Sequence, residues 1–266
     1  MKKGFAEVNG TKLYYEMMGE GHTVVLIHAG KLDRRMWEDQ FEKFSKHYKV
    51  VRYDVRGYGK SEIPQKPYSD VEDIYSLLKF LNIDKVCLVG VSMGGKIAID
   101  FTLEHPEMVN ALIPVDPDLS GFNWSNDEII QGYQSILETA RDEGESKAVE
   151  IWLKFPLFAP AMEKPEVGVR VRKLVKENSH VFLLNPLLRR QVKPKAMGRL
   201  LEIKAPTLII VGEKDVSDVL AIADILEKGI KGAQKIMIPG SGHLVNMEKP
   251  EEFNRIVLDF LSEHLR

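Results

Sequence analysis

The sequence Gly90-Val91-Ser92-Met93-Gly94 lies between the apolar run Val86–Val89 and a segment with helical periodicity that begins at Gly95. A G-x-S-x-G pattern at a strand-to-helix corner is typical of a nucleophile elbow, in which a strained turn exposes the serine hydroxyl. We expect the two glycines to allow the sharp turn by removing Cβ atoms. The N–H groups at the start of the following helix would point to the same place, where an oxyanion could be stabilised. The pattern therefore predicts that Ser92 is a nucleophile.

On both sides of this corner, short apolar runs alternate with helical patterns. Continuous apolar runs of this length are typical of strands that are buried on both faces in a parallel sheet. A hairpin is predicted at the N-terminus, where Asn9-Gly10 separates two alternating segments. The sequence thus predicts an α/β fold with a mostly parallel central sheet and helices on both faces. The remaining strands are expected at residues 23–27, 50–53, 86–89, 111–115, 207–211 and 235–238.

Between residues 119 and 201 the alternation stops and the pattern becomes mostly helical. We expect residues 119–201 to form a helical lid (cap) subdomain on a core domain made of residues 1–118 and 202–266. A capping box is predicted at Ser125–Glu128. Residues 167–175 fit either strand or helix spacing, and the helical interpretation is favoured.

The side chains of this insertion allow two interpretations each. Its aromatic residues can form the insertion's own core, or they can line a substrate pocket. The Lys- and Arg-rich stretch between Lys164 and Lys204 can be a solvated face, or it can attract an anionic substrate. The candidate substrate-binding residues are Trp124, Trp152, Phe155 and Phe158.

Composition excludes several classes of protein. The 266 residues carry a net charge of −2, so no strong field favours nucleic acid or an anionic membrane. The single Cys87 cannot form an internal disulfide, which favours a reducing compartment and a cytoplasmic location. No stretch approaches the roughly 18 apolar residues of a membrane span. The oligomeric state is left open.

A serine hydroxyl needs a base to act as a nucleophile, and the base needs an orienting group. Among the seven histidines, only His243 follows a predicted strand in a sharp glycine-flanked turn. Asp215 comes directly after the strand at 207–211, whereas Asp116 and Asp118 are rival acids after the strand at 111–115. His243 could instead cap the last helix, and Asp215 could cap the helix that follows it. The order Ser92, Asp215, His243 is the order expected of a hydrolase triad, and all three would meet at one sheet edge.

Taken together, these motifs resemble the α/β-hydrolase fold superfamily, in its serine esterase, lactonase and perhydrolase branch. The motifs are His28-Ala29-Gly30, Asp54-x-Arg56-Gly57-x-Gly59-x-Ser61, Gly90-x-Ser92-x-Gly94-Gly95, Gly212-x-x-Asp215 and Gly242-His243. The resemblance implies that Ser92 is the nucleophile, His243 the general base and Asp215 its orienting acid. It also implies an oxyanion hole formed by the backbone N–H groups of Gly30 and Met93. Ala29 departs from the pattern, since the family usually has glycine there.

The leading hypothesis is a serine hydrolase that cleaves a small carboxylic ester or lactone through an acyl-enzyme, with no metal and no cofactor. Its partner would be a small-molecule substrate, with neither nucleic acid nor membrane involved. One alternative is a ligand-binding or signalling protein of this fold with slow hydrolysis. Another is a cofactor-free lyase or C–C bond hydrolase that uses the same triad. Serine at position 92 disfavours the relatives with an aspartate nucleophile.

Overall fold

The computed structural model describes residues 1–265 and places their strands in one eight-stranded sheet, in the order β1-β2-β4-β3-β5-β6-β7-β8. The pairs β1–β2 and β2–β4 are antiparallel, and every other neighbouring pair is parallel. The mostly parallel sheet predicted from the sequence is therefore confirmed. The strands are β1 (Lys2–Val8), β2 (Thr11–Met18), β3 (Thr23–Ile27), β4 (Lys49–Tyr53), β5 (Val86–Val91), β6 (Val109–Val115), β7 (Leu208–Gly212) and β8 (Gln234–Ile238).

The predicted N-terminal hairpin is also present. Asn9 and Gly10 both adopt positive φ angles, of 48° and 68°, which is the backbone conformation that a tight two-residue turn requires. The turn sets the register of β1 against β2, with Val8 opposite Thr11. This hairpin extends the parallel sheet at one edge.

Helices cover both faces of the sheet, and the strand side chains alternate between two apolar cores. Val24 and Leu26 of β3 belong to the core under α1 and α10, whereas Val25 and Ile27 belong to the core under α2, α3 and α8. Burial on both faces explains why the strands read as continuous apolar runs. The helices are α1 (Glu38–Ser45), α2 (Asp70–Phe80), α3 (Met93–Glu104), α8 (Ser217–Gly229), α9 (Val245–Glu248) and α10 (Pro250–His264).

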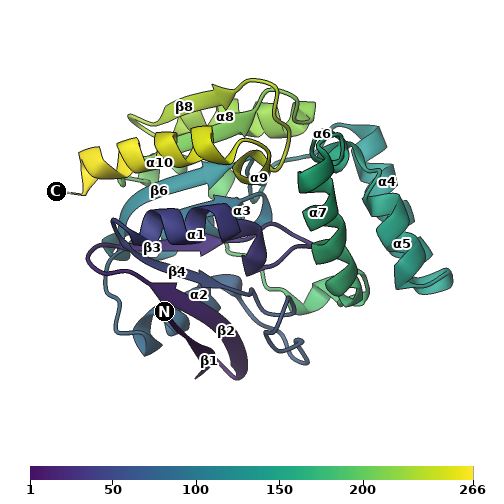
Figure 1. Ribbon diagram of the computed structural model, residues 1–266, viewed down its shortest axis with the longest axis horizontal. Coiled ribbons are helices and arrows are strands. Elements are labelled where there is room, and N and C mark those ends of the chain that lie inside the picture. Colours follow the sequence, from purple (N-terminus) through teal and green to yellow (C-terminus); the bar gives the residue numbers. More distant parts are fainter. Residues whose placement is uncertain (266) are drawn as a thin grey trace.

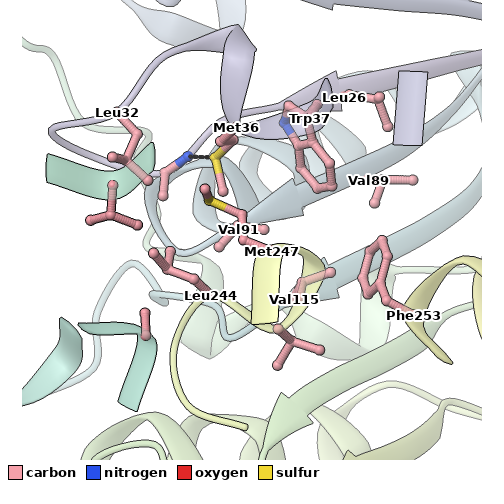
Figure 2. Close-up of a cluster of buried hydrophobic side chains, with 14 of the residues drawn as sticks. Leu26, Leu32, Met36, Trp37, Val89, Val91, Val115, Leu244, Met247 and Phe253 are labelled. Atoms are coloured by element: carbon pink, nitrogen blue, oxygen red, sulfur yellow. Dashed lines mark hydrogen bonds between the residues drawn. The ribbon is translucent and has the colours of Figure 1, made fainter. Parts of the chain in front are cut away.

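The core under α1 and α10 also supports the loops beyond the strands. Figure 2 shows Trp37 and Phe253 approaching the side chains of β3 and β5, and the two rings lie 6.1 Å apart. In the same cluster, the sulfur of Met36 accepts a hydrogen bond from the Ala29 backbone N–H at 3.2 Å, drawn as the dashed line in Figure 2. The loop after β3 is thus fixed to the apolar core.

The segment between β6 and β7 is helical, as predicted. Its helices group beside the carboxyl ends of the parallel strands, on the right in Figure 1. The ambiguous residues 167–175 lie in a helix, so the interpretation favoured from the sequence is confirmed. The helices are α4 (Asp127–Asp142), α5 (Glu145–Trp152), α6 (Ala159–Met162) and α7 (Pro165–Glu177).

The capping box predicted at Ser125–Glu128 is wrong in its capping residue. The side chain of Asn126 accepts from the N–H groups of Glu128 and Ile129 and so caps α4. Ser125 instead donates its hydroxyl to Asp218 of α8 at 2.7 Å. The cap moves one residue because the Ser125 hydroxyl binds a carboxylate in the core. Within residues 1–265, no helix is long and apolar enough to cross a membrane.

Candidate active site

Ser92 lies at the junction of β5 and α3 with φ 54° and ψ −115°. Positive φ is rare for a residue with a side chain, and such strain is concentrated at functional sites. The flanking glycines have the role expected from the sequence, since the corner leaves no room for a Cβ atom at either position. A Cβ on Gly90 would lie 2.2 Å from the carbonyl oxygen of Gly94, and a Cβ on Gly94 would lie 2.2 Å from that of Ile27. The glycines therefore allow close packing of the corner, while Ser92 itself carries the unusual turn.

His243 and Asp215 form a buried pair. The Nδ1 atom of His243 lies 2.7 Å from Oδ2 of Asp215. Oδ1 of the same carboxylate accepts the backbone N–H of Val216 at 2.7 Å. A carboxylate can only accept at this distance, so Nδ1 carries the proton and Nε2 is left free to accept one. Of the two expected roles for Asp215, capping of α8 and orientation of His243, the structure shows the contact that orientation requires.

Asp116, the rival acid, contacts the same region without contacting the histidine ring. Its carboxylate accepts the N–H of Gly212 at 2.8 Å and that of Val245 at 3.5 Å. Burial and the nearby negative charge of Asp215 raise its pKa well above the usual range. Asp116 therefore connects the loop that carries Asp215 with the loop that carries His243.

A cavity of about 490 Å³ opens above the elbow. Ser92, Met93, Gly30 and His243 line it from the core, so the sequence correctly placed these residues together. All four aromatic candidates of the helical segment line it as well. Three of these, Trp152, Phe155 and Phe158, are also buried in the apolar core. The two interpretations of the aromatic residues are therefore compatible: they pack against one another and face the cavity. The aromatic residues that line the cavity are Trp124, Trp152, Phe155, Phe158, Tyr133 and Tyr58. Met93, which follows Ser92 in the chain, also lines it.

The loop after β3 accommodates alanine where glycine is usual, because Ala29 does not adopt a positive φ. His28 fixes this loop. Its Nδ1 lies 2.8 Å from the carbonyl oxygen of Ala29, and its Nε2 accepts the N–H of Val55 at 2.9 Å. Burial lowers the pKa of His28, which favours this neutral tautomer. His28 thus has a structural role.

Two cations that line the cavity were not singled out by the sequence. Arg189 lay within the Lys- and Arg-rich stretch, and its guanidinium pairs with Asp70 at 2.8 Å. Lys31 follows the small-residue loop, and nothing in the local pattern distinguished it from a surface lysine. Other cations of the stretch pair with carboxylates of the core, including Arg170 with Asp39 and Lys164 with Glu248. Part of the stretch therefore ties the helical segment to the core domain through ion pairs, and Arg199 with Glu104 is a further one.

Comparison with known proteins shows the family of this chain. The sequence pattern of the alpha/beta hydrolase family matches residues 24–256. The human serine hydrolase BPHL is 28% identical over 96% of this chain and 84% of its own length. A 2-hydroxy-6-oxo-6-phenylhexa-2,4-dienoate hydrolase of Comamonas testosteroni is 26% identical over 94% of this chain and 91% of its own.

Among solved structures, the enol-lactonase of Burkholderia xenovorans LB400 has 27% sequence identity and a TM-score of 0.81. That likeness covers 97% of this chain and all of the lactonase chain. The family pattern spans both parts of the core and the helical segment between them. On this basis, the chain belongs to the alpha/beta hydrolase family and is a hydrolase, and its relatives include enzymes named for small-molecule substrates.

Proposed function

We propose that this hydrolase cleaves a small carboxylic ester or lactone through an acyl-enzyme, with Ser92 as nucleophile, His243 as general base and Asp215 as its orienting acid. The observation that supports this most is the 2.7 Å contact between His243 and Asp215 beside a cavity that Ser92 also lines. A histidine held by a carboxylate at Nδ1 has its Nε2 available to accept a serine proton.

In the first half of the reaction, Ser92 Oγ attacks the carbonyl carbon, and its proton moves to Nε2 of His243. The carbonyl oxygen becomes an oxyanion, for which the N–H groups of Gly30 and Met93 are the proposed donors. Neither N–H donates to an acceptor among residues 1–265. The C–O bond to the alcohol then breaks, and the departing oxygen takes the proton from Nε2. The acyl group remains on Ser92.

In the second half, a water molecule replaces the alcohol. His243 Nε2 takes one proton from the water as its oxygen attacks the acyl carbon. The second oxyanion collapses, the bond to Ser92 Oγ breaks, and the proton returns from Nε2 to that oxygen. The acid product leaves, and the starting state is restored. In a lactone the alcohol stays attached to the acyl group, so a hydroxy acid is released.

The helical segment is proposed to act as the lid of this site. Its helices stand at the carboxyl ends of the strands (Figure 1), and its aromatic side chains form one wall of the cavity. Trp152 stacks on Phe155 with ring centroids 5.2 Å apart, and Phe158 meets the His243 ring edge-on at 6.4 Å. An apolar wall beside the base would bind the acyl or alcohol chain and keep bulk water away from the site.

Hydrolysis of a C–C bond is a second candidate, supported by the relative from Comamonas testosteroni, whose name describes such a dienoate substrate. The two candidate functions can be distinguished by the substrates that the protein hydrolyses. An ester hydrolase turns over p-nitrophenyl acetate and simple lactones, whereas a C–C hydrolase would cleave a 2-hydroxy-6-oxo-dienoate far faster than either.

The proposal is tested with Ser92→Ala. By comparison with subtilisin, in which loss of the nucleophile costs about 2 × 10⁶ in kcat, turnover of p-nitrophenyl esters should fall by several orders of magnitude. The circular dichroism spectrum should be unchanged. Residual activity within tenfold of the wild type would reject Ser92 as the nucleophile.

A further inference from the structure

Lys31 is a lysine in an unusual place. Only 6% of its surface is exposed, and its side chain lines the same cavity as Ser92. Its backbone has φ 65°, in the left-handed region that residues with a side chain seldom occupy. The preceding residue is Gly30, the proposed oxyanion donor. The fold therefore holds this ammonium in the cavity that Ser92 lines, at some cost in backbone strain.

The surroundings of the ammonium leave its charge without a counter-ion. Within residues 1–265, no carboxylate lies within 4.0 Å of Lys31 Nζ. Among the described residues, the one polar contact of Nζ is the carbonyl oxygen of Val181, at 3.3 Å. The aromatic rings of Phe182 and Tyr133 lie 4.7 Å and 5.9 Å from Nζ. An ammonium has three donors, so at least one is free to bind a ligand.

The other charged groups of the cavity do not supply that counter-ion. Arg189 adds a second positive charge, and its guanidinium is already bound by Asp70. Asp118 lines the cavity too, and its carboxylate accepts the N–H of Leu119. Burial and the charge of Arg189 lower the pKa of Lys31 to about 8. A buried, unpaired cation is costly, and an anion brought by the substrate would relieve that cost.

We infer that Lys31 forms a carboxylate-binding subsite of this cavity, so that the preferred substrates are esters or lactones that carry a second, free carboxylate. This inference deepens the proposed function and rests on it. Binding forms a charge-assisted hydrogen bond between Nζ and a carboxylate oxygen in a site shielded by Phe182 and Tyr133. The interaction places the negative end of the substrate at Lys31 and its ester carbonyl at Ser92.

The test compares two esters of similar shape. Monomethyl adipate carries a free carboxylate, and methyl 6-methylheptanoate has an isopropyl group in its place. Shorter and longer diacid monoesters, from glutarate to suberate, cover the unknown reach between the two ends. The wild type should hydrolyse the best monoester at least tenfold faster than its neutral counterpart, as the ratio of kcat/KM. Equal rates across the series, with neutral esters well hydrolysed, would overturn the subsite while leaving the proposed function intact.

Variants assign the preference to Lys31. Lys31→Met removes the charge but keeps the length, so the ratio should fall to about one. Lys31→Arg keeps the charge, and it should retain a preference for the monoester. Lys173→Met is the matched control, because Lys173 is exposed on α7 within the Lys- and Arg-rich stretch, and its ratio should equal that of the wild type. If the preference for the monoester is lost in Lys173→Met and kept in Lys31→Met, it arises from the positive charge of the Lys- and Arg-rich stretch and not from Lys31.

Binding without turnover separates the two hypotheses. Calorimetry with Ser92→Ala protein should detect monomethyl adipate, and the second change Lys31→Met should weaken that binding at least tenfold. If no ester is hydrolysed by the wild type and this Lys31-dependent binding persists, the proposed function fails and the subsite stands. If binding is the same with and without Lys31, the subsite is rejected.

Discussion

The core and the helical segment hold the residues around the cavity in different ways. In the core, directional hydrogen bonds fix the polar groups: His243 to Asp215 at 2.7 Å, Asp116 to the N–H of Gly212 at 2.8 Å, and His28 to Val55 at 2.9 Å. In the helical segment, the wall consists of stacked aromatic rings. Trp152 packs against Phe155 and Phe158, and its indole N–H has no partner among residues 1–265.

This difference has a consequence for function. Hydrogen bonds set positions to a fraction of an ångström, as proton transfer requires, whereas apolar packing sets a shape that tolerates substitution. Changes in the core are therefore expected to alter the rate of the chemical step. Changes in the helical segment are expected to alter which substrates are accepted.

The sharpest contrast within the core is between its two buried carboxylates. Asp215→Asn leaves a side chain of the same size but puts His243 in the wrong tautomer. The corresponding change in serine proteases costs about 10⁴ in kcat, and we expect a similar loss here. Asp116→Asn should cost less than tenfold, because the amide oxygen can still accept the 2.8 Å hydrogen bond from Gly212 and only the longer contact with Val245 is lost. Steady-state kinetics of both variants on one activated ester decides the matter. If Asp116→Asn is the more damaging, the acid follows β6 and not β7.

For the aromatic wall of the helical segment, we expect an effect on the preferred length of the substrate's acyl chain. Each buried CH₂ contributes roughly 0.8 kcal/mol, so kcat/KM for p-nitrophenyl esters should rise about threefold per acyl carbon until the cavity is full. Trp152→Ala should move the optimum to longer chains with little change in kcat for the acetate. Phe80→Ala is the control, because Phe80 is an exposed aromatic residue on α2 of the core domain, and this change should leave the profile unchanged. A flat profile in the wild type would show that the aromatic wall does not select substrates.

A further prediction concerns the pH dependence of substrate selectivity. Lys31 lies in the core domain, and its ammonium approaches aromatic rings of the helical segment. The pKa of Lys31 is lowered to about 8, so the ammonium predominates below pH 8 and is lost as the pH rises through that value. The preference for monomethyl adipate over its neutral counterpart should accordingly be full at pH 6.5 and decline above pH 8. Rates on the neutral ester at each pH correct for the titration of other groups. A ratio that stays constant to pH 10 would contradict a role for the Lys31 charge.

The smallest expected effect concerns how the helical segment is anchored. Asn126→Ala removes the cap of α4 and should lower the free energy of unfolding by about 1 kcal/mol. Asn126→Asp, which can still cap, should retain most of the stability. Urea denaturation of both variants measures the difference, and an equal loss in the two would indicate that the cap is not what Asn126 contributes.

The sequence was most informative where backbone geometry dictates residue type. The elbow and the turn before His243 each need small residues, and so their patterns were recognisable. Gly212 is an example: a Cβ there would lie 2.2 Å from the carbonyl oxygen of Gly242, which brings the loops of Asp215 and His243 together.

The remaining residues of the site depend on tertiary contacts that leave no local pattern. Arg189 resembled its neighbouring cations, and only the fold places it against Asp70 at the cavity. The difference between Asp215 and Asp116 likewise depends on where His243 lies in space. For Ser125, the deciding contact was Asp218, more than ninety residues later in the sequence.

The most direct test of the central claim is to trap the nucleophile. A fluorophosphonate should inactivate the wild type with a stoichiometry of one, and peptide mass spectrometry should place the adduct on Ser92. Inactivation should be slowed by substrate and be strongly reduced in Asp215→Asn. An adduct on Ser61 or Ser241 in the active protein, or full activity after Ser92 is modified, would contradict the acyl-enzyme account.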